Sequence, residues 1–238
     1  MKLKHILTAA ALAACALLPL GITRAEAASL TAKDKNIVTI SALAAQGDLP
    51  RLSAALHTAL DQGMTVNEAK EILIQLYAYA GFPRSLNGLN TLIRVTDERA
   101  ARGIHDTMGP EANTVDMTAD RYAIGQATQT RLVGHPLKSR LYDEFAPTIS
   151  TFLKEHLFYD IFQRGLLTPQ ERELATVGFL SGIGNVNPQL AGHMQVSLNV
   201  GITREELQEA IQVLEETVSS KTADNAEAVF QKLTAPKA

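Results

Sequence analysis

The pattern of hydrophobic and polar positions is clearest between residues 167 and 214, where it predicts three consecutive helices. The first begins after Thr168, because a threonine hydroxyl followed by proline is a typical helix start. A hinge at 182–188, rich in glycine, asparagine and proline, then interrupts the apolar spacing. The second helix covers Leu190 to Val200, and a capping-box pattern at 203–206 opens the third.

The first third of the chain repeats this pattern at a shift of 137 to 138 residues. The Leu-Thr pair at 30–31 falls on the pair at 167–168, and Gly47 falls on Gly184. An internal duplication is therefore the main architectural feature. The first copy is also predicted to have three helices, near 33–46, 50–62 and 66–80.

A bridge of residues 98–166 joins the two copies. Its first part is predicted to be a loop, because glycine, proline and asparagine cluster at 103–113. Helices are predicted over Asp120–Val133 and Phe145–Phe162. No run alternates with period two, so strands are not expected. The sequence thus predicts an all-α fold of two related helical units fused in one chain. The expected divisions are 28–97 for the first unit, 98–166 for the bridge and 167–238 for the second unit.

The N-terminal segment 1–27 has the features of a secretory signal peptide. Lys2 and Lys4 precede an apolar run from Ile6 to Ile22, and the small-x-small sequence Ala25-Glu26-Ala27 follows. We expect cleavage after Ala27, a periplasmic or secreted protein and no stable membrane span. The apolar run is short and interrupted, which disfavours the alternative of a permanent anchor. A second alternative is a lipoprotein processed at Cys15.

Cys15 is the only cysteine, so cleavage after residue 27 leaves no thiol and no disulfide. The formal net charge of the full chain is −3, and loss of the lysine-containing leader makes the mature chain more acidic. Such a surface has no basic footprint for nucleic acid, and no nucleic-acid partner is expected.

Three motifs in the second copy resemble those of the carboxymuconolactone decarboxylase family, part of the AhpD-like superfamily. They are Arg172-Glu173-Leu174, the His-x7-Gly spacing from His193 to Gly201, and the run Gly201-Ile202-Thr203-Arg204-Glu205-Glu206. The resemblance extends to the segment Tyr77–Asn87 of the first copy and to the lead-in at 145–165. It implies an AhpD-like helical fold, a cofactor-free lyase with a small acidic substrate, and a homo-oligomer that is a trimer or hexamer-like.

Many AhpD-like proteins are thiol peroxidases or reductases with a Cys-x-x-Cys motif four residues before the histidine. Here Val186 and Gln189 occupy those positions, which disfavours thiol chemistry because neither residue can form a thiolate. The resemblance therefore favours the decarboxylase branch.

The two copies differ where the chemistry would be. His193 aligns with Ala55, and the Tyr77–Asn87 motif aligns with 215–225, which has lost it. Each copy keeps a different half of the family pattern. This predicts one composite site between the copies and a decayed counterpart.

Decarboxylation of an unsaturated lactone requires a general acid, a cation for the substrate carboxylate and donors for the developing oxyanion. His193 is the candidate acid, with a structural histidine at the hinge as the alternative. Glu173 is the candidate that orients the imidazole or acts as partner acid, although it could serve only the helix dipole. An ideal hairpin leaves these two residues roughly 9 Å apart along the axis, so direct contact requires a bent hinge or a substrate between them.

The candidate carboxylate clamps are Arg172 and Arg84, because a guanidinium matches a carboxylate bidentately. A solvated charge on the helix face is the alternative for Arg172, whereas Pro83 would place Arg84 on the first turn of a new helix. The candidate oxyanion donors, with core packing as the alternative for the tyrosines, are Tyr77, Tyr79, Ser85 and Asn87. Glu71 is a further substrate-binding candidate by resemblance.

The remaining histidines of the mature chain show no metal-ligand spacing, and they are His57, His105, His135 and His156. We therefore predict no metal and no cofactor. The sequence favours a carboxymuconolactone decarboxylase-like lyase acting on a small carboxylated lactone or related acid. The alternative is a non-catalytic helical binding or assembly module on the same fold.

Overall fold

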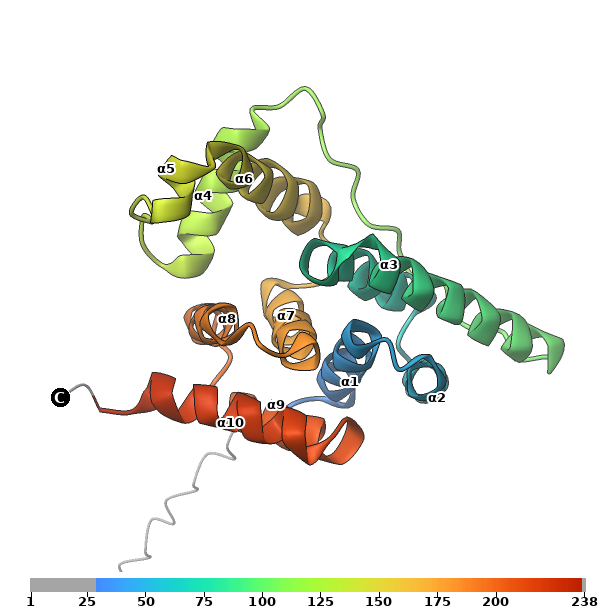
Figure 1. Ribbon diagram of the computed structural model, residues 1–238. Coiled ribbons are helices and arrows are strands. Elements are labelled where there is room, and N and C mark those ends of the chain that lie inside the picture. Colours follow the sequence, from blue (N-terminus) through green and yellow to red (C-terminus); the bar gives the residue numbers. More distant parts are fainter. Residues whose placement is uncertain (1–28, 237–238) are drawn as a thin grey trace, which may run out of the picture.

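The computed structural model describes residues 29–236, and the predicted leader lies outside this range. Every regular element in the described part of the chain is helical (Figure 1). The first copy contains α1 (Ala32–Gln46), α2 (Leu49–Asp61) and α3 (Val66–Ala101). The bridge contains α4 (Arg121–Val133), α5 (Leu141–Phe145), α6 (Pro147–Phe152), the π-helix η1 (Leu153–Ile161) and the 3₁₀-helix η2 (Phe162–Arg164). The second copy contains α7 (Pro169–Ile183), α8 (Asn187–Asn199), α9 (Arg204–Thr217) and α10 (Ser220–Thr234).

Four helices begin at a threonine whose hydroxyl accepts a backbone N–H three residues later, while the acidic residue there binds back to the threonine backbone. These N-caps are Thr31, Thr65, Thr168 and Thr203. They come in two pairs at equivalent positions of the copies. The capping boxes thus fix the starts of α1, α3, α7 and α9, in agreement with the predicted boundaries.

Helix α3 is longer than the predicted segment 66–80. The chain breaks at Gly81, which has φ 77° and ψ 164°, and a second helical segment then continues to Ala101. Pro83 lies in the first turn of that segment, where its missing N–H costs no hydrogen bond. The second copy breaks at the equivalent place, between α9 and α10. Helix α10 was not predicted, and it is the counterpart of the second segment of α3.

The bridge differs from prediction at its second helix. The expected single helix over 145–162 is divided, since Pro147 begins a new helix after a backbone break at Ala146. Residues 153–161 then adopt π-helical geometry and tighten to a 3₁₀ turn that ends at Arg164. Helix α4, by contrast, lies where the sequence placed it.

Helices α1 and α7 lie side by side at the centre of the molecule (Figure 1). Their close approach depends on small residues: a Cβ built on Gly182 would lie 2.4 Å from the carbonyl oxygen of Ala42, and one on Gly178 would lie 2.8 Å from Ser41 Cβ. Helix α3 of the first copy also packs on α7, and α9 of the second copy packs on α1. The two copies therefore share one hydrophobic core, as two related units fused in an all-α fold.

Within residues 29–236, none of the helices is both long enough and apolar enough to cross a membrane.

Candidate functional site

The Glu173–His193 dyad is the centre of the candidate site. Nδ1 of His193 lies 2.8 Å from Oε2 of Glu173. The glutamate side chain is fully buried, whereas the histidine side chain is 19 % exposed. A carboxylate can only accept hydrogen bonds, so this contact places the imidazole proton on Nδ1 and leaves Nε2 to exchange protons.

The direct contact corrects the expected separation of roughly 9 Å for an ideal hairpin. The hinge between α7 and α8 is bent. Gly184 has φ 68° and ψ 166°, and Asn185 has φ 56°, a left-handed conformation that asparagine tolerates. These two residues carry the chain into α8 in a direction that lets both side chains meet.

Tyr79, from the first copy, completes the group. Its ring meets the His193 ring edge-on with centroids 5.6 Å apart and also contacts the ring of Phe179 at 5.7 Å. Its hydroxyl is buried and has no hydrogen-bond partner within the described residues. Burial, and secondarily the Glu173 carboxylate, raise the pKa of this hydroxyl far above its usual range. Tyr79 is thus a buried, protonated donor beside the dyad.

Arg172 points away from the dyad into a buried polar network. Its side chain is 1 % exposed, so it is not a solvated charge on the helix face. Nη2 donates to Oε1 of Glu71 at 2.9 Å and to the carbonyl of Gly165 at 2.9 Å, while Nη1 donates to Gln75 at 2.8 Å. Burial lowers the pKa of the guanidinium, and the Glu71 carboxylate opposes that shift. Arg172 and Glu71 therefore form a buried ion pair with each other.

Gln75 and Arg164 belong to the same network, and the sequence analysis missed both. Arg164, at the end of η2, binds Glu71 with Nε at 2.9 Å and Nη2 at 3.0 Å. Gln75 donates to the carbonyl of Arg172 and to the hydroxyl of Thr176, both at 3.0 Å. The available signal was the spacing of four between Glu71, Gln75 and Tyr79 on one helix, which aligns three polar side chains on one face.

The bridge covers one side of this site. A second apolar cluster joins α4 and η1 to α8 and to the end of the first segment of α3. Its buried members are Leu132, Leu157, Phe158, Ile161 and Val196, with Tyr77 and Tyr79 packed against them. The site therefore lies where both copies and the bridge meet.

The other predicted site residues lie away from the dyad or form hydrogen bonds with the backbone. Arg84 is exposed on the second segment of α3 and lies over Gly47, since a Cβ there would come within 1.4 Å of its guanidinium. Ser85 is buried and donates to the carbonyl of Leu73 at 2.7 Å across the break in α3. Asn87 is exposed. Among the predicted site residues of the segment Tyr77–Asn87, Tyr79 is the one whose ring contacts that of His193.

Tyr77 lies next to the site but faces the bridge. Its ring stacks on Phe82 at 4.7 Å and meets the His156 ring edge-on at 5.3 Å. Its hydroxyl, like that of Tyr79, is buried without a partner in the described residues. Nδ1 of His156 donates a hydrogen bond to the Asp160 carboxylate at 2.7 Å.

Among residues 29–236, no three side chains of histidine, cysteine, aspartate or glutamate are placed to hold a metal ion. Val186 precedes α8 and Gln189 is exposed in its first turn.

The model of the carboxymuconolactone decarboxylase family matches two segments of the chain, residues 9–93 and 147–232. Together they cover well over half of the sequence, and they begin 138 residues apart, which is the offset of the internal repeat. The first segment begins inside the predicted leader. A search of curated proteins gives no significant match. The two family segments, the helical fold and the paired helices show that the chain belongs to the carboxymuconolactone decarboxylase family and carries two of its units.

Proposed function

We propose that this protein is a cofactor-free lyase that decarboxylates a small carboxylated lactone or a related acid, with His193 as the proton donor. One observation carries the proposal: the imidazole of His193 is held by the fully buried carboxylate of Glu173 at 2.8 Å while part of the ring stays accessible. A carboxylate in that position fixes the tautomer and stabilises the imidazolium.

The chemistry follows from these groups. As the substrate carboxylate leaves as CO₂, its electron pair enters the unsaturated lactone and forms a dienolate. Protonated His193 delivers a proton from Nε2 to the dienolate carbon, and the neutral imidazole remains bound to Glu173 through Nδ1. The buried hydroxyl of Tyr79 is the candidate donor to the enolate oxygen, because it is protonated and has no hydrogen-bond partner among residues 29–236.

Neither predicted arginine clamp is part of this proposal. Arg172 is paired with Glu71, and Arg84 lies over Gly47 at the end of α1. The substrate carboxylate is therefore expected to lie toward solvent at the accessible edge of His193. In that position it stays hydrated until it leaves, and the lactone ring is expected to lie toward Tyr79, whose ring packs on the second apolar cluster.

The test is the turnover of carboxymuconolactone, followed by CO₂ release, for the mature protein and for His193→Gln. Loss of a general acid typically lowers turnover roughly 10²- to 10⁴-fold. His135→Gln is the matched control, because His135 is exposed on the loop after α4. Thermal melts confirm that both variants fold. Full turnover in His193→Gln would contradict the proposal.

A non-catalytic binding or assembly module is the second candidate, and exposed apolar side chains favour it. Leu141 and Phe145 of α5 are 89 % and 92 % exposed, a degree of exposure that is unusual for large apolar residues. Absence of turnover for a panel of small carboxylated lactones, together with self-association that depends on these side chains, would favour the module.

A further inference from the structure

The helical part of the bridge, residues 114–163, is joined to the rest of the protein by two segments that lie side by side. Its helices gather on one side of the molecule (Figure 1). Where the chain enters and leaves this part, the backbone N–H of Asn113 donates to the carbonyl of Arg164 at 2.7 Å. The amide of Asn113 also lies over Gly165, since a Cβ built there would come within 2.7 Å of its nitrogen. The two connections therefore meet at one place, as the two sides of a hinge do.

The connection that leaves the bridge has an unusual backbone. Gly165 and Leu166 both have positive φ, 63° and 57°, and the N–H of Leu167 donates to the carbonyl of Gly165 at 2.6 Å. A left-handed conformation is uncommon for leucine, because its Cβ crowds the backbone. Arg172 holds this turn from the core, since its Nη2 donates to the same carbonyl at 2.9 Å. The chain thus bends sharply beside a fixed point on α7.

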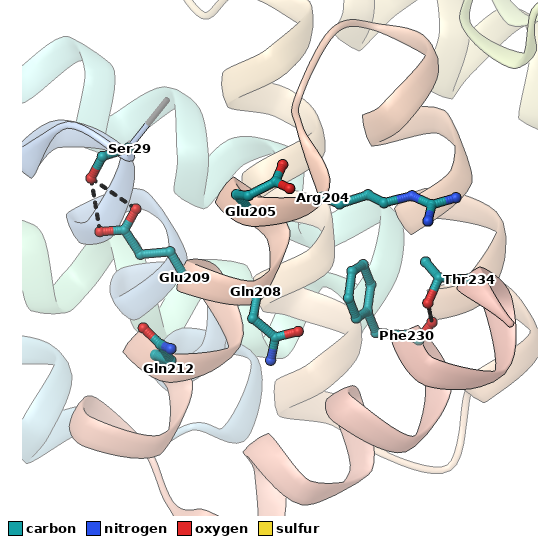
Figure 2. A pocket seen from close by; sticks show the side chains of 8 residues that line it. All are labelled: Ser29, Arg204, Glu205, Gln208, Glu209, Gln212, Phe230 and Thr234. Atoms are coloured by element: carbon teal, nitrogen blue, oxygen red, sulfur yellow. Dashed lines mark hydrogen bonds between the residues drawn. The ribbon is translucent and has the colours of Figure 1, made fainter. Parts of the chain in front are cut away.

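The core side of this connection is anchored through Glu71. Arg164 binds both oxygens of Glu71, whose side chain is 1 % exposed. Glu209 is the equivalent of Glu71 at a shift of 138 residues, and its side chain is 22 % exposed. Figure 2 shows Glu209 at a surface hollow, where the hydroxyl of Ser29 lies 3.1 and 3.0 Å from its two oxygens. The buried anchor therefore belongs to the connection with the bridge and is not a general property of the repeat.

Within itself the bridge is tightly packed. Gly125 of α4 lets η1 approach closely, since a Cβ built there would lie 1.9 Å from the carbonyl oxygen of Lys154. The amide of Gln163 donates to the hydroxyl of Thr128 at 2.6 Å, which ties the end of the bridge back to α4. The bridge helices can therefore move together as one body.

The bridge is attached to the two copies more loosely. The copies contribute one buried residue to the second apolar cluster, Val196 on α8, beside partly buried side chains such as that of Tyr79. Apart from the hinge, the polar contact between residues 114–163 and the rest of the described chain is made by Asn199. Its amide donates to the carbonyl of Val133 at 2.7 Å, at the end of α4. Asn199 thus acts as a latch opposite the hinge.

We propose that residues 114–163 form a hinged lid, which swings about Asn113 and residues 164–166 and opens the seam above Tyr79 and His193. The structure shows the closed state, in which the hydroxyl of Tyr79 is buried. That hydroxyl can meet a substrate only after one of its covers moves, and the bridge is the loosely attached cover. Closure then excludes water from the site, as lids do in other enzymes. The purpose of the lid rests on the proposed function, whereas its opening requires no substrate.

Thiol labelling measures the opening, because the full chain has one cysteine, Cys15. In a Cys15→Ser background, one cysteine at a time is introduced and its reaction with dithionitrobenzoate is followed. Val196→Cys reports on the seam, and Val177→Cys, which is buried in α7, reports on global unfolding. We expect Val196→Cys to react roughly 10²-fold faster than Val177→Cys, because local opening costs less free energy than unfolding. Thr58→Cys gives the rate without a lid, since Thr58 is the exposed equivalent of Val196 in the first copy.

Two further substitutions separate the opening of the lid from unfolding. Asn199→Ala removes the latch and should speed the labelling of Val196→Cys roughly fivefold. Ile211→Val weakens the core at α9, so it should speed Val177→Cys roughly fivefold and leave Val196→Cys unchanged. The open state keeps the core of the two copies, which is why the core substitution does not favour it.

Thr128→Cys tests whether the lid moves as one body. Thr128 is buried between α4 and the end of the bridge, so a swinging lid should keep this thiol nearly as protected as Val177→Cys. Labelling of Thr128→Cys as fast as that of Val196→Cys would show that the bridge unfolds, and would overturn the hinge.

Three other results would also overturn the lid. They are labelling of Val196→Cys as slow as that of Val177→Cys, labelling as fast as that of Thr58→Cys, and an equal response of both valine sites to Ile211→Val. The labelling experiment contains no substrate. Its failure is therefore distinguishable from a failure of the proposed reaction, which the turnover of His193→Gln tests.

Discussion

The candidate site and its counterpart in the other half of the repeat are built on equivalent helices but carry different side chains. Where one copy has the Glu173–His193 dyad, the other has Asn36 and Ala55. The counterpart of Tyr79 is Thr217, whose hydroxyl lies 3.1 Å from that of Thr39. An amide that binds Gln62, a methyl group and a hydrogen-bonded hydroxyl thus replace a carboxylate, an imidazole and an unpaired phenol.

The apolar packing over the site also differs between the two copies. The bridge helices α4 and η1 pack over α8 and the tyrosines of α3. At the equivalent surface of the first copy, the residues that correspond to Val196 and Val200 are Thr58 and Gln62, and both are exposed. The comparison teaches that the fold alone does not make a site. In the described residues, the site that has the dyad also has the unpaired hydroxyl of Tyr79 and the apolar cover, whereas its counterpart lacks all three.

The largest expected effect distinguishes two ion pairs at equivalent positions of the repeat: Arg172 with Glu71, and Lys35 on α1 with Glu209 on α9. Arg172→Met should destabilise the protein by about 3 kcal/mol, because Glu71 stays buried after it loses one of its two cations. Lys35→Met should cost less than about 1 kcal/mol, since that pair is screened by solvent. Urea denaturation measures both values. Equal losses would show that the two pairs are equally important.

The next effect concerns the seam between the copies. Gly182→Ala should cost roughly 1 to 3 kcal/mol, because its Cβ would overlap the backbone of Ala42 and force α1 and α7 apart. Gly192→Ala is the control, since nothing lies within 4 Å of the added methyl group on helix α8. It should stabilise by roughly 0.5 to 1 kcal/mol. Thermal denaturation of both variants checks the contrast, and a neutral Gly182→Ala would contradict the tight seam.

The helix starts were predictable because their signals are local. Thr168 and Thr203 are followed three residues later by Glu171 and Glu206, and that spacing alone builds each capping box. The π-helix at 153–161 was not predictable, because the apolar spacing of a π-turn is close to that of an α-helix. Its geometry depends on contacts with α4 that a local pattern does not contain.

The site was predictable in its residues and less so in its contacts. Sequence motifs identified His193 and Glu173, but their contact depends on the torsions of Gly184 and Asn185. The burial of Arg172 depends on Glu71, which lies 101 residues away and reaches it only after the two copies pack. Local sequence cannot show such pairings.

Tyr79→Phe gives a smaller and more selective effect. Removal of a buried hydroxyl without a partner should raise stability by about 1 kcal/mol, because the desolvated donor is no longer present. Turnover should fall roughly 10²-fold if the hydroxyl binds the enolate oxygen. Tyr159→Phe is the control: it loses a hydrogen bond to the carbonyl of Asp116 at 2.7 Å and should destabilise by about 1 kcal/mol. Full turnover in Tyr79→Phe would show that Tyr79 contributes packing and no hydrogen bond to the enolate oxygen.

The smallest effect on stability concerns assembly. We expect a trimer or a hexamer-like ring, as the family resemblance implies, and the exposed Leu141 and Phe145 are candidates for its contacts. The double variant Leu141→Ser and Phe145→Ser should lower the molecular mass measured by light scattering and leave the monomer's unfolding nearly unchanged. A monomeric wild-type protein at micromolar concentration would contradict the ring.

The most direct test of the central claim is ¹⁵N NMR of histidine-labelled mature protein titrated with carboxymuconolactone. The account predicts that the ring nitrogens of His193 shift on binding. It also predicts that the Nδ1 proton shows a downfield hydrogen-bonded signal that is lost in Glu173→Gln. The signals of His57, His105 and His135 should not move. Unchanged His193 signals at saturating ligand, or equal shifts of all histidines, would contradict the assignment of the working site to the Glu173–His193 dyad.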